Sequence, residues 1–174
     1  SDQGTAWSAA NFDDSGWAEG PSELGYAEGD EATLVVYIDT DPLIGGTQRN
    51  ATTYFRTNIE LPEPSSYSHF VVKLKYDDGA AVYANGTEIL RTTNLPATAG
   101  HDTFASRGTP NERSFFDFEV PSSRFVDGVN TLAVEIHNAS PASSDISFDM
   151  MLRGEIDTTD GDRITKPVIN HSLE

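Results

Sequence analysis

The stretch HFVVKLKYDDGAAVYANGTEILR, residues 69–91, decides the fold class. In residues 69–76 every second residue is apolar, which is the period of a β-strand with one buried face. Asn85-Gly86 lies between two further short runs, 80–84 and 87–91, and an Asn-Gly pair in that position is typical of a two-residue type I′ turn. We therefore expect three strands here, the last two joined as a hairpin.

The same two-residue period recurs along the chain, whereas no stretch has the apolar stripe of an amphipathic helix. It predicts further strands over 33–38, 53–60, 114–120, 130–137 and 146–153. This many strands without helices favours an all-β fold, a jelly-roll β-sandwich of two antiparallel sheets. We expect one domain over residues 1–153 and a polar linker or tail over 154–174, in which Leu173-Glu174 is interpreted as a cloning remnant.

The chain is strongly acidic. Its 174 residues include 11 Lys and Arg against 28 Asp and Glu, a net charge of −17 at pH 7. This sign argues against nucleic acid and anionic membrane surfaces as partners. The acids that precede the first basic residue, Arg49, are Asp2, Asp13, Asp14, Glu19, Glu23, Glu28, Asp30, Glu31, Asp39 and Asp41. Such a segment needs cations from elsewhere in the fold, a bound metal ion, or open solvent.

Cysteine is absent, which excludes disulfides, thiolate zinc sites and cysteine nucleophiles. No apolar run is long enough for a transmembrane helix, and no signal peptide begins at Ser1. A chain of this length buries enough apolar surface to fold without disulfides. We expect a secreted or cell-surface domain from a longer bacterial protein.

Motifs for catalysis are not found. The sequence lacks G-x-S-x-G, a P-loop and G-x-G-x-x-G, and its four histidines are not spaced as zinc ligands. Pairs of carboxylates that could hydrolyse a glycosidic bond arise by chance among 28 acids. We therefore expect an ancillary domain rather than an enzyme.

Two acidic turns each have two interpretations. Asp77-Asp78-Gly79 is either a tight turn with positive φ at the glycine or an oxygen-rich corner for calcium. Asp13-Asp14-Ser15-Gly16-Trp17 presents the same choice, and further acids follow it without a basic residue. Calcium takes about six to eight oxygen ligands, so scattered carboxylates and carbonyls can hold it.

The 92–113 connection is longer than a hairpin requires and is the predicted ligand site. Its aromatic, guanidinium and polar groups suit a carbohydrate, including an anionic one. The candidates are Arg91, Asn94, His101, Asp102, Phe104, Arg107 and Arg113, and the loop also contains Asn111 and Glu112. The alternative is a solvated loop that Arg91 and Asn94 tie to the sheet. For Trp7 and Trp17, buried packing is the simpler interpretation.

Several stretches between Trp7 and Arg153 resemble, in the same order, stretches of one group of known domains. They are FDDSGW (12–17), LGY (24–26), TYFR (53–56), YDDGAAVYANGTE (76–88), RTTNLP (91–96), NTLAVEIHN (130–138) and SSDISFD (143–149). Together they resemble the galactose-binding-domain-like β-sandwiches of carbohydrate-binding-module type that are appended to secreted bacterial polysaccharide-degrading enzymes. The resemblance implies a jelly roll, a sugar site at loops or on a sheet face, and a structural calcium ion near the chain ends. An Asp on the last strand binds calcium in such modules, and Asp149 occupies a comparable place. The candidates for the remaining ligands are Asp13, Asp14 and Glu23.

These observations lead to the hypothesis of a monomeric, non-catalytic carbohydrate-binding module that targets a covalently linked catalytic domain to a polysaccharide or oligosaccharide. A tethered module raises the local substrate concentration even when it binds weakly. The alternative is a structural or adhesive extracellular β-sandwich without sugar affinity, because one fold serves many functions.

Overall fold

The structure, a computed structural model, describes residues 2–35, 38–39, 48–158 and 161–167. Its elements are η1 (Ala6–Ser8), β1 (Leu24–Tyr26), β2 (Thr33–Leu34), β3 (Ile38–Asp39), β4 (Gln48–Arg49), β5 (Thr52–Leu61), η2 (Pro64–Ser66), β6 (His69–Asp77), β7 (Gly79–Ala84), β8 (Thr87–Arg91), β9 (Phe116–Pro121), η3 (Ser122–Arg124), β10 (Gly128–His137), β11 (Ile146–Asp157) and β12 (Arg163–Pro167). The three η elements are short 3-10 helices, and none of the helices in these ranges is long and apolar enough to cross a membrane.

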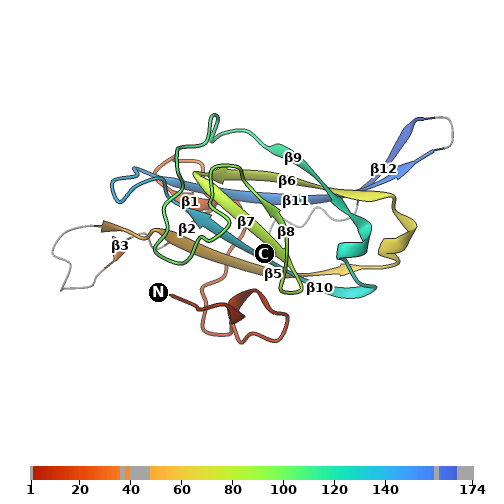
Figure 1. Cartoon of the computed structure of the whole chain (residues 1–174), viewed down its shortest axis with the longest axis horizontal. Coiled ribbons are helices and arrows are strands. Elements are labelled where there is room, and N and C mark those ends of the chain that lie inside the picture. The colour runs from red at the N-terminus through yellow and green to blue at the C-terminus, as the bar shows by residue number, and fades with distance from the viewer. Residues whose placement is uncertain (1, 36–37, 40–47, 159–160, 168–174) are drawn as a thin grey trace.

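Two sheets lie face to face (Figure 1). The first has the strand order β2-β1-β11-β6-β9, with β12 paired to the far end of β11, and the second has the order β5-β10-β7-β8. Within these sheets every pairing is antiparallel except that of β1 with β2. β3 and β4 form a separate two-stranded ribbon. The prediction of an all-β fold with two mainly antiparallel sheets is confirmed.

The core between the sheets consists of the apolar side chains that alternation marks as inward. β6, β11 and β9 supply one wall and β5, β10 and β7 supply the other. Phe55 of β5 stacks on Phe148 of β11 with ring centroids 4.4 Å apart, so this contact joins the two walls directly. Each fully buried side chain of this size contributes roughly 1.5–3 kcal/mol.

The two connections within the deciding stretch differ, since the first joins β6 to β7 of the other sheet and the second joins β7 to β8 of the same sheet. Asn85 and Gly86 have φ values of 51° and 82°, as a type I′ turn requires, so the predicted hairpin is confirmed. Gly79 does not have the positive φ that the turn interpretation expects. A Cβ at this position would lie 2.9 Å from Cβ of Ala105, so the glycine is needed because the 92–113 loop packs closely against the turn.

The ends of the chain differ from the expectation in detail. β11 continues past Arg153 to Asp157 and pairs with β12, and this hairpin projects from the sandwich (Figure 1). The assignment of 154–174 as a linker stays a prediction, and Leu173-Glu174 lies outside the described residues. Of the strand predicted over 33–38, the described residues contain β2 and the first residue of β3.

The outer face of the second sheet is covered rather than solvated. Trp7 of η1 packs on Tyr54 and Tyr83 with ring centroids 4.6 and 5.4 Å apart. On the same face His137 is buried, and its Nδ1 lies 2.6 Å from the carbonyl oxygen of Thr103 in the 92–113 loop. β10 is therefore buried on both faces, because η1 and this loop lie against it.

Candidate functional site

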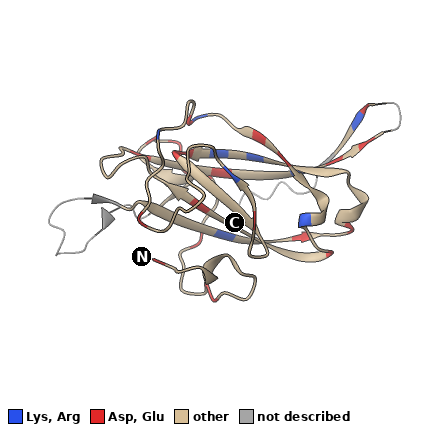
Figure 2. Cartoon of the chain, viewed as in Figure 1, with Lys and Arg blue, Asp and Glu red and all other residues tan. Residues whose placement is uncertain are grey.

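One end of the sandwich brings together four segments that are far apart in the sequence. β11 lies between β1 and β6, and its first residues pair with the last residues of both: Ile146 with Tyr26, and Ser147 with Asp77. β9 also pairs antiparallel with β6, so the loop before β9 reaches the same end. Acidic residues outnumber basic ones over the whole fold (Figure 2), and this end holds two acidic groups.

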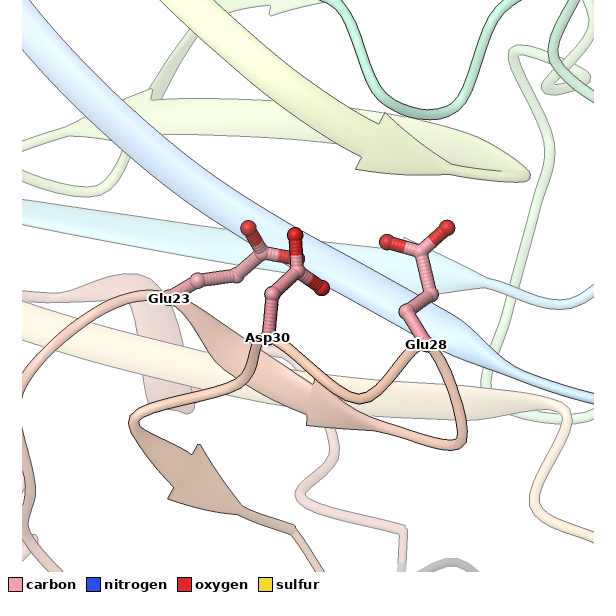
Figure 3. Close-up of side chains that lie close together, drawn as sticks. All are labelled: Glu23, Glu28 and Asp30. Atoms are coloured by element: carbon pink, nitrogen blue, oxygen red, sulfur yellow. The ribbon is translucent and has the colours of Figure 1, made fainter.

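The first acidic group consists of Glu23, Glu28 and Asp30, which flank β1 (Figure 3). Glu23 precedes the strand, and the other two lie in the loop that leads to β2. The carboxylate of Glu31 shapes this loop, since it accepts hydrogen bonds from the backbone N–H groups of Glu28 and Gly29 at 2.6 and 2.9 Å. All three carboxylates of the group stand on the same side of the loop (Figure 3).

Lys75 of β6 provides the cation for this first group. Its Nζ lies 2.5 Å from Glu23, 3.5 Å from Glu28 and 3.8 Å from Asp30. Burial by itself would lower the pKa of Lys75, but the hydrogen bond and charge of Glu23 and then the charges of Asp30 and Glu28 outweigh it, so the pKa is raised. Ser147 completes the site by donating its hydroxyl to Glu23 at 2.6 Å. The group is thus an internal ion cluster with its own cation.

The second acidic group consists of Glu28, Glu112 and Asp145, and it shares Glu28 with the first. One carboxylate oxygen from each lies within 4.8 Å of the others. Within the described ranges, the only cationic groups within 4.0 Å of these carboxylates contact Glu28: Lys75, and Arg113 through Nε at 3.8 Å. Glu112 and Asp145 have no such neighbour there. Burial and the charges of Asp145 and Glu28 raise the pKa of Glu112 accordingly.

Asp77 and Asp78 lie behind the second group, at the end of β6. Asp78 connects the loops around it, because its Oδ2 accepts hydrogen bonds from the backbone N–H of Ala139 at 2.6 Å and the hydroxyl of Ser143 at 3.3 Å. Its carbonyl oxygen accepts the side-chain amide of Asn94 at 3.0 Å. The hydrogen-bond partners of Asp78 are therefore protein groups of other loops, not the nearby backbone groups that the tight-turn interpretation expected.

Asp77 is less well satisfied. It is 3% exposed, and its Oδ1 has no hydrogen-bond partner among the described residues. Burial, a hydrogen bond to Asp78, and the charges of Asp78, Asp145 and Glu112 raise the pKa of Asp77 to about 9. Its charged neighbours are thus acids, which is the opposite of the environment of Glu23.

Two residues predicted for ligand binding hold the 92–113 loop in place. Arg91 forms an ion pair with Glu88 at 2.6 Å and donates to the carbonyl oxygen of Pro96 at 3.0 Å and the hydroxyl of Tyr83 at 3.2 Å. Asn94 is buried, and its side-chain amide donates to Asp78 and to the carbonyl oxygen of Arg107 at 2.8 Å. Their protein partners favour the structural alternative for both residues.

The remaining loop candidates differ in their surroundings, and His101 Nε2 lies 3.9 Å from Asp102 Oδ1. His101 stacks on Tyr54 with ring centroids 5.9 Å apart, and its Nδ1 lies 3.2 Å from the tyrosine hydroxyl. Asp102 is fully exposed, and Phe104 is half-buried. Arg107 and Arg113 have exposed side chains. Among these candidates Arg107 and Arg113 are therefore the exposed basic groups of the loop.

The predicted calcium ligands also lie apart. Neither acidic group in the described residues includes Asp13, Asp14 or Asp149. Asp13 accepts hydrogen bonds from the backbone and hydroxyl of Ser15, which lower its pKa. Asp14 forms an ion pair with Arg56 at 2.7 Å. Asp149 lies on β11 opposite Lys75, and its Oδ1 accepts the backbone N–H of the next residue. Glu23, the fourth candidate, is held by Lys75.

A groove that was not predicted runs beside β5, an edge strand of the second sheet. Its volume is about 260 Å³, and it is lined by Asp14, Trp17, Ala18, Glu19, Gly20, Leu24, Tyr54, Phe55, Arg56, Thr57 and Asn58. Trp17 is half-buried here, whereas Trp7 has the buried packing that we expected of both. The turn residues before Trp17 are the only sequence signal for this groove.

A second hollow of about 430 Å³ lies between η2 and η3 at the other end of the sandwich. Acidic, serine and proline residues line it, and its one aromatic residue, Phe125, is buried. It offers no exposed ring for stacking.

Comparisons with known proteins find distant likeness only. No protein-family model and no curated protein matches the sequence. Among solved structures, the chain is similar to a β-glucuronidase from Bacteroides uniformis at 16% identity and a TM-score of 0.47, covering 99% of this chain and 25% of that one. A β-glycosidase from Bacteroides vulgatus gives 14% identity, a TM-score of 0.42, and coverage of 86% and 18%.

An α-L-rhamnosidase from Streptomyces avermitilis gives 22% identity and a TM-score of 0.39, with coverage of 67% of this chain and 10% of that one. The chain thus spans between a tenth and a quarter of the length of these sugar-cleaving enzymes. The likeness is too distant to transfer a residue or an activity.

Proposed function

We propose that this chain is a non-catalytic carbohydrate-binding domain that binds a polysaccharide in the groove beside β5. The observation that supports the proposal is the position of Trp17, half-buried in a groove whose other side chains are largely polar. An aromatic ring with a few fixed polar groups is the usual arrangement of a small-ligand site, and the apolar face of a sugar ring stacks on such a side chain.

The turn before the groove holds Trp17 in place. Asp13 organises this turn through Ser15, and the backbone N–H of Trp17 donates to the carbonyl oxygen of Asp14 at 2.8 Å. The ring of Phe12 contacts the ring of Trp17 edge-on, with centroids 5.8 Å apart. The indole is therefore ordered before a ligand arrives, which reduces the entropy lost on binding.

Polar groups along the groove suit hydroxyl recognition. Arg56 is fixed by Asp14 and by hydrogen bonds to the carbonyl oxygens of Trp7 and Ala9, so it acts mainly as a support. Asn58 is exposed, and its Oδ1 accepts the hydroxyl of Thr131 at 2.7 Å, which orients the amide nitrogen. The volume, about 260 Å³, lies just below the range of roughly 300–1000 Å³ typical of small-ligand pockets.

The proposal also covers the strand connections, the location of the protein, and the domain to which this chain is linked. We infer a jelly-roll connection of the strands, a secreted or cell-surface location, and a covalently linked catalytic domain, as the resemblance of the sequence implies. A structural calcium ion belongs to the same proposal, although Asp14 and Glu23 already have cationic partners. The exposed groups of the 92–113 loop, Arg107 and Arg113, are the second candidate surface for sugar.

Affinity electrophoresis and titration calorimetry against a panel of neutral and anionic polysaccharides test the proposal. We expect Trp17→Ala to weaken binding by at least tenfold while Phe115→Ala, the loss of an exposed aromatic outside the groove, leaves it unchanged. If Arg107→Ala abolishes binding and Trp17→Ala does not, the loop is the site and the groove is wrong.

The structural or adhesive alternative makes the opposite prediction. No polysaccharide would then be retarded by the protein at millimolar concentration, with or without calcium. An assay for released sugars on the same panel tests the non-catalytic assignment, and sustained product formation by the isolated chain would contradict it.

A further inference from the structure

We propose that the groove beside β5 selects a glycan that carries free amino groups, such as a chain of glucosamine units, and that Glu19 determines this specificity. The inference rests on the proposed function, because it names the class of polysaccharide that the same groove binds. It follows from the charged side chains along the groove and from the partners that each of them already has in the protein.

The basic residue of the groove is not available to an anionic ligand. Among the described residues that line the groove, Arg56 is the only basic one. Its side chain is 4% exposed, and its Nε donates to Asp14 at 2.7 Å. Its Nη1 donates to the carbonyl oxygens of Trp7 and Ala9, and its Cζ lies 5.3 Å from the ring centroid of Phe12. A buried guanidinium with these partners does not offer a carboxylate or a sulfate the paired contacts that such groups need.

Glu19 gives the groove an unbalanced negative charge. The charged residues of the lining are Asp14, Glu19 and Arg56, and the ion pair between the first and the last neutralises both. Glu19 is exposed, and within the described part of the chain its carboxylate has neither a hydrogen bond nor a basic side chain within 4.0 Å. The charge of this carboxylate therefore remains for a ligand.

Trp17 and Glu19 together suit an ammonium group on a sugar ring. Both residues line the groove and they are two positions apart in the sequence. The face of an indole attracts cations, and a carboxylate accepts strong hydrogen bonds from an ammonium group. A 2-amino sugar has an apolar ring face and an ammonium group beside it, so it can meet both residues. A neutral sugar lacks the charge, and a uronic acid would place a second carboxylate near Glu19.

The groove must be distinguished from the acidity of the whole chain. A net charge of −17 attracts any positively charged polymer, without a specific site. Glu60 provides the matched comparison, because it is an exposed glutamate on β5, the same edge strand, but does not line the groove. Removal of its charge changes the net charge by the same amount as removal of the charge of Glu19.

Calorimetry with three hexasaccharides of equal length tests the charge preference. The sugars are oligomers of glucosamine, of N-acetylglucosamine and of galacturonate, at about pH 5.5, where a free carboxylate is ionised and the sugar amine is protonated. We expect the glucosamine oligomer to bind about three- to fivefold more tightly than its acetylated form, as one exposed ion pair allows, and the galacturonate oligomer to bind most weakly. Added salt should reduce the difference between the first two oligomers.

Three variants locate the preference. Glu19→Gln should weaken binding of the glucosamine oligomer to the level of the acetylated oligomer, whose own binding should not change. Trp17→Ala should weaken both by at least tenfold, whereas Glu60→Gln should leave both as they are in the unaltered chain. An equal loss in Glu60→Gln and Glu19→Gln would assign the attraction to net charge and overturn the proposal.

The remaining outcomes separate this proposal from the proposed function. If the acetylated oligomer binds in a manner that depends on Trp17 but the glucosamine oligomer has no advantage, the preference for amino groups is wrong and the carbohydrate site stands. The same conclusion holds if Glu19→Gln retains the full preference. If none of the three oligomers binds at millimolar concentration, both proposals are overturned.

Discussion

The two acidic groups at one end of the sandwich contain the same kind of side chain and share Glu28, yet they differ in how their charge is balanced. In the first, Lys75 lies among Glu23, Glu28 and Asp30. In the second, no basic side chain of the described residues lies within 4.0 Å of Glu112 or Asp145. The number of acids in a group therefore does not decide whether a basic side chain of the protein balances their charge. What decides the charge balance is whether the neighbouring strand directs a basic side chain toward the carboxylates, as β6 does with Lys75.

The largest effect is expected from removing the internal cation. Lys75→Met leaves the buried carboxylates of Glu23 and Glu28 without their partner, so the free energy of unfolding in chelator should fall by about 3–5 kcal/mol. Urea denaturation measures this fall in the free energy of unfolding. The control is Lys73→Met on the same strand, whose partner Asp117 is half exposed, and this variant should lose less than about 1 kcal/mol. Equal losses in both variants would contradict the comparison.

The pH dependence of stability tests the raised pKa of Asp77. Because its pKa is raised from 3.8 to about 9, its neutral form stabilises the native state fully below pH 4, and this contribution is lost as the pH rises toward 9. Asp77→Asn keeps a neutral donor at every pH. In chelator we expect the variant to be about as stable as the unaltered chain at pH 4 and to become progressively more stable than it as the pH rises toward 9, because each pH unit between the two pKa values costs the ionisable side chain up to about 1.4 kcal/mol. A difference that does not change between pH 4 and pH 9 would contradict the raised pKa of Asp77.

Supplying a lysine to the second group should make it resemble the first. Glu112→Lys should raise the free energy of unfolding in chelator by about 1–2 kcal/mol, because a fixed ammonium replaces a repelling carboxylate. The control is Asp102→Lys, with the same change of charge at a fully exposed position, which should alter stability by less than about 0.5 kcal/mol. A fall in the free energy of unfolding of Glu112→Lys would contradict the repulsion between Glu112 and its acidic neighbours.

The smallest effect is expected at the periphery of the first group. Asp30 is 60% exposed and lies 3.8 Å from Lys75 Nζ, so Asp30→Asn should cost less than about 0.5 kcal/mol in urea denaturation. A loss as large as that of Lys75→Met would mean that the exposed carboxylate, rather than Glu23, holds the lysine.

The alternation of apolar residues was enough to predict β5 to β11 within a few residues, because each of these strands buries one face against the other sheet. β1 was missed, since it has three residues and one is Gly25, which contributes no side chain to the pattern. β12 was missed because its residues are polar and its position depends on pairing with β11.

The candidate sites were less predictable for a physical reason. Glu28, Glu112 and Asp145 have no common spacing in the sequence, and they meet only because β11 pairs with both β1 and β6 and β9 pairs with β6. Arg91 and Asn94 have the composition of a binding loop, but their donors serve the protein's own carbonyl and carboxylate groups. Residue type indicates what a side chain can bind, whereas only the register shows which partners it has already found.

The position of β1 has a consequence for the order in which this chain folds during synthesis. Leu24 pairs with Phe148, and β2 reaches the first sheet only through β1, so β1 and β2 have no strand to pair with except each other until β11 has left the ribosome. At about 5–20 residues per second the wait is roughly 6–25 s. The first 48 residues contain acids and no basic residue, and this charge keeps the waiting segment soluble until its partner strand arrives.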